Sequence, residues 1–144
     1  MSLRTVMDGL VTAEATIAPT GYGLGVYRWW EPHMQLPCLW NELTSGTRTE
    51  RADACRVEDY LRVDVVIVPP PAPDHGHDML AIEDVADAAC STLDVALAQP
   101  SPLSGAIQSG RRLGMQTTTE RLGAETQLLA FRVPLELKLI RNYP

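Results

Sequence analysis

The strongest constraint on the fold is the last long segment of the chain, Gln127 to Arg141. Apolar side chains occupy every second position of it, at Leu129, Phe131, Val133, Leu135, Leu137 and Leu139. Since successive side chains of a strand point to opposite faces, this spacing predicts a β-strand with one apolar and one mostly polar face. At ~3.4 Å per residue its fifteen residues would span roughly 50 Å, whereas a compact domain of this length is roughly 40 Å across. We therefore expect the strand to bend at Pro134 or to project beyond the domain.

A second long strand is predicted from Cys55 to Ile67. Its apolar positions are Cys55, Val57, Leu61, Val63, Val65 and Ile67, and its polar positions are Arg56, Glu58, Tyr60, Arg62 and Asp64. A shorter strand from Leu36 to Leu43 precedes it and opens on Pro37, a residue typical of sheet edges. The polar segment Thr44 to Asp53 predicts a turn or protruding loop, so the two strands should form a hairpin with an extended tip.

Two segments have the periodicity of amphipathic helices. The first carries Leu3, Val6, Met7, Leu10 and Val11, with Ser2 available as its cap and Pro19-Thr-Gly21 as its end. The second runs from Met79 to Ala98, with an apolar stripe at Ile82, Val85, Ala86, Ala89, Leu93 and Leu97. Acidic residues lie on its other side, at Glu83, Asp84, Asp87 and Asp94. Each helix therefore has one face that must be buried against a sheet.

The segments after the second helix have weaker patterns. Gln99 to Gly105 predicts a loop, and Ala106 to Gln116 has weak strand character interrupted at Ser109 to Arg112. The polar segment Thr117 to Thr126 predicts a mobile loop before the final strand. The order helix, strand, strand, helix, strand, strand predicts a single α+β domain over residues 1–144. We expect a mainly antiparallel sheet with the helices packed on one face.

Charge and composition exclude several classes of function. The net charge of −6 disfavours a general nucleic-acid binder or a protein bound to acidic membranes. No stretch approaches the ~20 apolar residues that cross a bilayer, and Asp8 and Glu14 interrupt any signal peptide. Cys38, Cys55 and Cys90 form no C-x-x-C pair, so we expect small buried hydrophobes and neither disulfides nor a zinc site. We expect no membrane partner, no sequence-specific nucleic acid and no export.

Three motifs are candidates for ligand binding. Gly21 to Gly25 is not a dinucleotide loop, because Val26 stands where the third glycine is needed. Trp29 and Trp30 are adjacent large aromatics, which we expect to pack over the core or at a subunit contact. The loop Asp74 to Asp78 contains two histidines and could be a metal site or a connector in which Asp78 caps the next helix. The connector is favoured, because no other His/Asp cluster supplies further ligands.

No catalytic constellation emerges from the residues. The serines lack the context of a hydrolase nucleophile, and the three histidines lie in predicted loops. We therefore expect no enzyme, no cofactor and no metal. The remaining enzyme alternative is a small metal-dependent hydrolase that uses His75 and His77.

The order of elements resembles that of the tail terminator proteins of long-tailed bacteriophages. The resemblance runs from the first helix to the last strand, through Gln35–Leu39, Asp64–Val68, Met79–Ala98 and Arg132–Lys138. It implies a homohexameric ring that caps the tail tube, ends its polymerisation and joins the head connector. The implied partners are further copies of the chain, the tail tube protein and the connector protein. The implied location is the head-proximal end of the virion tail, after assembly in the host cytoplasm. Another neck or head–tail connector ring protein is the alternative.

Two pairs of arginines are candidate partner-binding residues. Arg48 and Arg51 lie at the tip of the predicted hairpin, and Arg111 and Arg112 lie in a glycine-flanked segment. The planar guanidinium can bind carboxylates through two hydrogen bonds and is weakly hydrated. We expect at least one pair to contact an acidic rim of a tube or connector subunit. The alternative is that these arginines are simply solvated.

Overall fold

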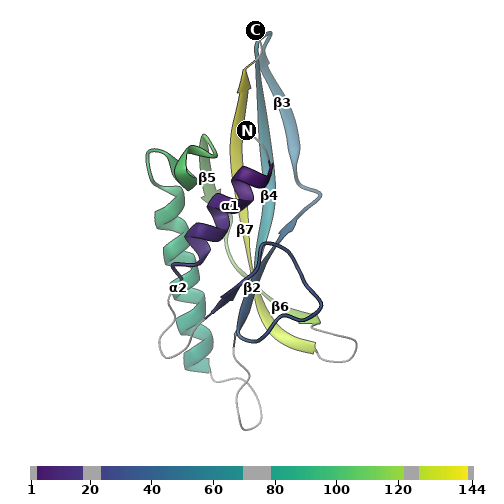
Figure 1. Ribbon diagram of the computed structural model, residues 1–144, viewed down its shortest axis with the longest axis vertical. Helices are drawn as coiled ribbons and strands as arrows, with labels where there is room; N and C mark the ends of the chain where they lie inside the picture. The colour runs from purple at the N-terminus through teal and green to yellow at the C-terminus, as the bar shows by residue number, and fades with distance from the viewer. Residues whose placement is uncertain (1–2, 18–23, 70–78, 122–126, 143–144) are drawn as a thin grey trace.

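The computed structural model describes residues 3–17, 24–69, 79–121 and 127–142. Two helices cover one face of a seven-stranded sheet (Figure 1). This arrangement confirms the predicted α+β fold with helices on one side. No helix in the described ranges is long and apolar enough to cross a membrane. The elements are α1 (Leu3–Glu14), β1 (Gly25–Val26), β2 (Cys38–Leu43), β3 (Arg48–Asp53), β4 (Arg56–Val68), α2 (Met79–Leu97), the 3-10 turn η1 (Pro102–Gly105), β5 (Ser109–Arg112), β6 (Gln116–Arg121) and β7 (Gln127–Asn142).

The sheet is organised around β4 and β7, which pair antiparallel along most of their length. Their register runs from Arg56 opposite Asn142 to Ile67 opposite Phe131. β2 and β3 lie end to end along the outer edge of β4, and β6 and β5 lie end to end along the outer edge of β7. β1 adds a short parallel pair against β2. Apart from β1, the sheet is therefore antiparallel and four strands wide, because β2 with β3 and β6 with β5 share its two outer positions.

Pro134 explains the interruption between β5 and β6. Its carbonyl accepts a hydrogen bond from the Leu113 N–H at 2.8 Å, so its backbone faces the β5–β6 side. In an antiparallel ladder the N–H and C=O of one residue face the same neighbour, so the N–H that proline lacks would be missing on this side. The outer chain bulges here, with Gly114 at a φ of 122° that favours glycine. The predicted bulge lies in the outer chain opposite Pro134 and not in the last strand, whose register with β4 continues unbroken through Pro134.

β3 and the adjoining ends of β4 and β7 form a three-stranded arm that extends beyond the helices (Figure 1). The arm comprises Arg48–Asp53, Arg56–Tyr60 and Lys138–Asn142. All six residues of β3 are exposed. The projection predicted from the length of the last strand is therefore confirmed.

Three polar segments are strands that the sequence did not predict. Arg48–Asp53, expected within a loop, is β3, and Gln116–Arg121, expected within a mobile loop, is β6. Ser109–Arg112, expected to interrupt a strand, is the strand β5. These segments lie along the outer edges of β4 and β7, where backbone pairing holds them to the sheet. Their outer position lets them carry polar side chains, so apolar alternation could not reveal them.

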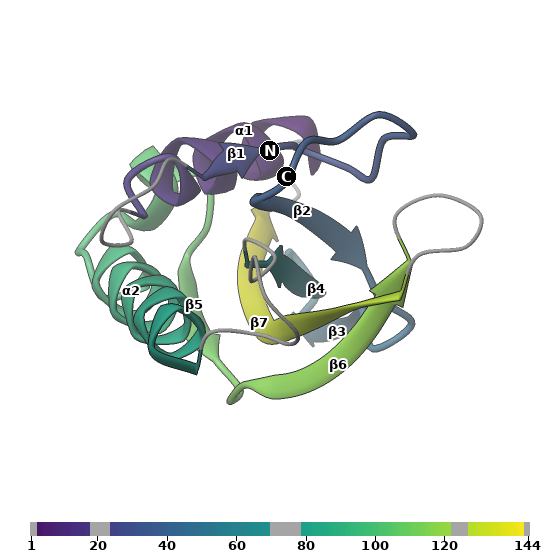
Figure 2. The ribbon, with the colours of Figure 1, turned by 90° about the horizontal axis from the view of Figure 1, so that it is seen from below.

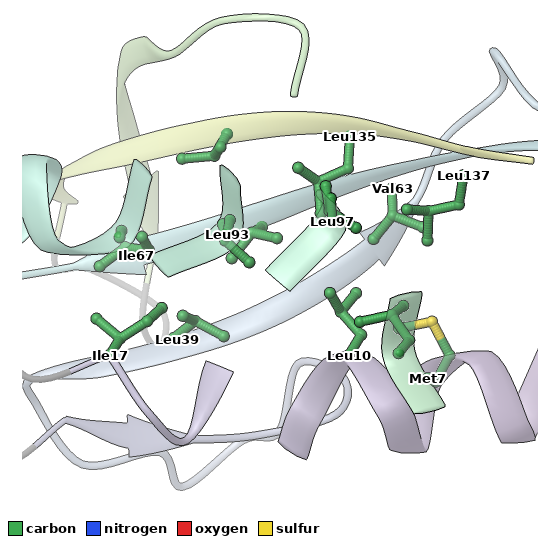
Figure 3. Packing of buried hydrophobic residues seen from close by; sticks show 14 of the residues in the cluster. Met7, Leu10, Ile17, Leu39, Val63, Ile67, Leu93, Leu97, Leu135 and Leu137 are labelled. Atoms are coloured by element: carbon green, nitrogen blue, oxygen red, sulfur yellow. The ribbon is translucent and has the colours of Figure 1, made fainter. Parts of the chain in front are cut away.

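The main core lies between the helices and the sheet (Figure 3). Side chains from α1, α2, β2, β4 and β7 meet there, among them Met7, Leu10, Leu39, Val63, Leu93, Leu97, Leu135 and Leu137. Both predicted helices are confirmed, and so are the predicted apolar faces of the two long strands apart from Cys55, which lies in the turn before β4. A Cβ added at Gly9 would lie 2.9 Å from Leu103 Cβ, so glycine allows η1 to pack directly on α1. The predicted helix cap Ser2, the segment Pro19–Gly21 and the loop Asp74–Asp78 lie outside the described residues.

A second, smaller core lies on the opposite face of the sheet. Its buried members are Cys38, Trp40, Val66, Val68 and Ala130. Tyr27, Met34 and Leu36, from the segment between β1 and β2, pack against it. The end of β4 is therefore buried on both faces, which accounts for its continuous run of apolar residues.

The cysteines differ in their environments. Cys38 is buried, as expected, and Cys90 is half-buried. The expectation is wrong for Cys55, which is exposed in the turn between β3 and β4.

Glu14 and Asn41 are a fully buried polar pair between α1 and β2. Asn41 Nδ2 donates a hydrogen bond to Glu14 Oε1 at 2.7 Å, and within the described chain Glu14 Oε2 and Asn41 Oδ1 have no partner. Burial raises the pKa of Glu14 to about 8, against the opposing effect of the hydrogen bond from Asn41. A protonated carboxyl could donate to the free amide oxygen, whereas a carboxylate could not. Glu14 is therefore neutral at pH 7.

Glu14→Gln should remove a pH dependence of stability. The folded pKa of about 8 lies above the ordinary value of 4.5, so the folded state binds the extra proton between these pH values. The free energy of unfolding of the wild type should therefore fall as the pH rises from about 4.5 to about 8. Glu14→Gln should abolish most of this fall and be more stable at pH 9 by a few kcal/mol, measured by urea unfolding across pH. The exposed Glu31→Gln is the control, and equal pH slopes in wild type and Glu14→Gln would contradict the assignment.

Candidate partner-binding surface

On the face of the sheet opposite the helices, paired charges extend from the arm to the middle of the sheet. We call this charged area the polar face. The strand register brings Arg48, Tyr60 and Lys138 side by side on one rung, and Arg62, Glu136 and Arg111 on the next. The polar face comprises the side chains of Arg48, Glu50, Glu58, Tyr60, Arg62, Asp64, Arg111, Arg132, Glu136 and Lys138. These residues come from four strands, so the surface exists only in the folded sheet.

Glu136 is the centre of the part nearest the arm. Its Oε2 lies 3.0 Å from Arg48 Nη1, and its Oε1 lies 3.2 Å from Arg111 Nη2. The hydrogen bond from Arg48 holds the pKa of Glu136 below its usual value. The Arg48 guanidinium also lies 4.2 Å from the centre of the Tyr60 ring, within the range of a cation–π interaction. Glu136 thus brings together one arginine from each predicted pair.

The two predicted arginine pairs are not clusters in the structure. Arg112 lies on the helix side, where its Nε and Nη2 each bind the Asp94 carboxylate of α2 at 2.9 Å. Arg51 is exposed and has no ion pair among the described residues. Consecutive strand residues point to opposite faces, so Arg111 and Arg112 diverge, as do Arg48 and Arg51. The expectation of two contiguous patches is corrected to one shared site, Arg48 and Arg111 around Glu136.

Glu58 organises the neighbouring part of the polar face. It accepts a hydrogen bond from the Tyr60 hydroxyl at 2.7 Å and lies 3.2 Å from Lys138 Nζ and 3.1 Å from Arg56 Nη2. The Tyr60 hydrogen bond lowers the pKa of Glu58 and raises that of Tyr60. A hollow of about 120 Å³ lies between Tyr60, Lys138 and Arg111. Small-molecule pockets are typically ~300–1,000 Å³, so this surface suits contacts with protein side chains better than a bound ligand.

Arg132 ties four strands together farther along the face. Its Nη1 lies 2.7 Å from Glu42 Oε2 and 3.2 Å from Asp64 Oδ2, and its Nε lies 2.6 Å from Glu120 Oε1. The hydrogen bonds to Glu120 and Glu42 raise the pKa of Arg132. Burial disfavours ionisation of Glu42, but hydrogen bonds from Arg132 and Trp40 outweigh it and lower its pKa. One cation is shared by three carboxylates, so this end of the face keeps an excess of negative charge.

Glu136, Tyr60 and Arg132 were not predicted as site residues. The alternation of the two long strands already places them on the polar side, which was the available signal. What the sequence lacks is the register between β3, β4, β7 and β5, which decides the neighbours of each side chain.

Metal and aromatic candidates have different outcomes. Among the described residues, no group of three or more His, Cys, Asp or Glu is placed to hold a metal ion. The His75–His77 candidate lies outside the described residues. Trp29 and Trp30 are 39% and 48% exposed, so the expectation that they pack over the core is wrong. A role at a subunit contact remains a prediction.

Comparison with known proteins assigns no family: no protein-family model and no curated protein matches the chain. We therefore infer the function from the geometry of the sheet and from the resemblance in element order.

Arg132→Gln should destabilise the fold more than a matched change on the surface. It leaves Glu42, Asp64 and Glu120 facing one another without a cation, and Arg132 is only 22% exposed. We expect a loss of about 1–3 kcal/mol in the free energy of unfolding at pH 7, below the loss for a fully buried pair. Part of the loss should be recovered at pH 4, because Glu42, whose pKa the hydrogen bond from Arg132 helps to lower, takes up a proton more readily without that arginine.

The matched control is Arg111→Gln, which removes an ion pair whose arginine is 70% exposed. It should cost less than about 1 kcal/mol. Urea unfolding of both variants at pH 7 and pH 4 provides the measurement. Losses of similar size, or no recovery at pH 4, would show that the Arg132 network does not hold the four strands.

Proposed function

We propose that this protein is a ring-forming structural subunit of the tail terminator kind, which caps the tail tube of a long-tailed bacteriophage. In that role it ends polymerisation of the tube and provides the joint to the head connector. The resemblance in element order suggested this role, and the three-stranded arm is the structural observation that supports it.

The arm offers backbone hydrogen-bonding groups on both of its edges. Thr44 N–H donates to the Arg62 carbonyl, so even-numbered residues of β4 face β2 and β3. The even residues of β3 therefore face β4, and the N–H and C=O of Thr49 and Arg51 face outward. Across the arm, Gln108 N–H donates to the Lys138 carbonyl, and beyond it the described chain supplies no strand to pair the outer edge of β7.

Unpaired edges of this kind are used in proteins to join subunits. An open edge invites pairing with another chain, and a monomer normally blocks or covers it. Here the two edges lie on opposite sides of one arm, so contacts through them run head to tail. Head-to-tail contacts produce closed rings when the rotation between subunits closes.

The polar face supports docking against protein partners. Most of its charges are already paired within the chain, so a partner would meet mainly ordered side chains. Arg111, with a side chain 70% exposed, is more accessible than Arg48 or Arg112, and Arg51 is exposed on the other face of β3; both Arg111 and Arg51 suit an acidic rim. A neck or connector ring protein would use the same arm, and binding to isolated tubes distinguishes the two roles.

The first test is assembly. The purified protein should form rings, with a hexamer expected, at high concentration or on the ends of tail tubes. Mass photometry across a concentration series, with negative-stain imaging in the presence and absence of tubes, provides the measurement. A protein that remains monomeric under all these conditions is not a ring-forming cap.

The second test is charge reversal at the predicted arginines. Arg48→Glu with Arg51→Glu, or Arg111→Glu alone, should give overlong tails or tails without heads, because an acidic rim would be repelled. The double variant at Arg111 and Arg112 is included, although it also breaks the contact with Asp94.

The control for charge reversal is Arg4→Glu, an exposed change on α1 far from the arm in sequence. Tail length and head joining are measured in assembled particles, with circular dichroism to verify folding. If all the arginine variants fold, form rings and give head-joined tails of normal length, these arginines are not docking residues.

A further inference from the structure

A groove lies between α1 and α2 in the described part of the structure. Its volume is about 540 Å³, and η1 closes one side of it. Small residues form much of its lining, including Gly9, Ala13, Ser91 and Ala96. Val95 lies at the groove and is 59% exposed, which is high for a large apolar side chain. The groove is therefore a partly apolar hollow that the described chain does not fill.

Trp29 and Trp30 are two exposed aromatic side chains on the same molecule. They belong to the segment between β1 and β2, which projects on the side of the molecule away from α2 (Figure 2). The preceding residue, Arg28, forms an ion pair with Asp8 of α1, which ties this segment to the helix. Adjacent exposed tryptophans held in this way are typical of interaction surfaces.

The hydrogen-bonding groups of the groove complement an indole. Thr12 and Thr16 donate their hydroxyl protons to the carbonyls of Asp8 and Ala13, at 2.9 and 2.6 Å. Gln99 likewise donates its amide to the Val95 carbonyl at 3.0 Å. The hydroxyl oxygens of Thr12 and Thr16 and the amide oxygen of Gln99 remain as acceptors. The indole N–H is a donor only, so it can be satisfied there while its ring covers the small apolar residues.

We propose that Trp29 and Trp30 of one copy dock in the α1–α2 groove of the next copy. The two surfaces lie on different sides of the molecule, so the contact is head to tail and can repeat around a ring. This inference rests on the proposed self-assembly and names a contact within it.

The size of the contact sets its strength. Two tryptophans bury roughly 300–500 Å², which is less than the ~800 Å² per partner of a standard stable interface. A single contact should therefore be weak, and a closed ring gains stability from several such contacts acting together.

Two variants with separate defects provide the test. The first, Trp29→Ala with Trp30→Ala, removes the aromatic pair and leaves the groove. The second, Val95→Glu, keeps the aromatic pair and places a charge at the groove. Each should weaken self-association roughly 30-fold or more, the size of a tryptophan hot spot. Ser91→Trp, at another exposed lining position, blocks the groove independently. The test therefore does not depend on the folding of Val95→Glu alone.

The decisive experiment mixes the two variants. The intact groove of the first should accept the tryptophans of the second, so the mixture should associate more strongly than either variant alone, measured by sedimentation velocity across a concentration series. Trp40 is buried and is the remaining tryptophan of the first variant, so a blue shift of fluorescence on mixing reports Trp29 and Trp30 entering the groove. Leu43→Ala, at an apolar residue of similar exposure outside both surfaces, is the matched control and should associate like the wild type.

Each other outcome rejects the contact in a recognisable way. Unchanged self-association of either variant, or no gain in association on mixing the two, overturns it. A wild type that is monomeric at all concentrations also overturns it. If the variant without Trp29 and Trp30 still caps tail tubes, the proposed function stands and this contact is wrong. If the wild type is monomeric and that variant loses capping, the tryptophans contact the tube and not a second copy.

Discussion

The antiparallel pairing of β4 with β7 is the interaction on which the other elements depend. It joins residues far apart in the sequence, from Arg56 opposite Asn142 to Ile67 opposite Phe131. The outer edge of β4 pairs with β2 and β3, and the outer edge of β7 pairs with β5 and β6. Because this pair is longer than the helical layer, one part of it is covered by α1 and α2 and the rest projects as the arm (Figure 1). The length of two strands thus determines both where the core lies and which backbone groups stay available for other chains.

The same pairing separates two chemical environments. On the helix side, alternate residues such as Leu135 and Leu137 are fully buried in an apolar layer. On the other side, their neighbours Glu136 and Lys138 enter charge pairs with side chains from adjacent strands. The helix side is stabilised mainly by burial of apolar side chains away from water. The polar face is stabilised by Coulomb attraction, which salt weakens. A partner on the polar face meets charges whose positions are fixed by the core behind them.

The sequence predicted the elements with strong periodicity and missed those without it. Both helices and both long strands follow from apolar spacing, because burial of one face imposes that spacing. β3, β5 and β6 do not, because an outer strand is held by backbone pairing and its side chains are free to be polar. For the surface, the sequence identified arginines but not their neighbours. Arg48 and Arg111 meet at Glu136 through a register that no local pattern encodes.

The interruptions of the two outer strands have a mechanical consequence. The break between β2 and β3 lies beside Leu61 and Arg62 of β4, where β5 still covers β7. The break between β5 and β6 lies beside Val133 and Pro134, where β2 still covers β4. Because the breaks are staggered, at least three strands cross the sheet at every level between them. A lateral load on the arm is therefore passed to the helical body through continuous hydrogen bonding, while each break lets the sheet twist locally.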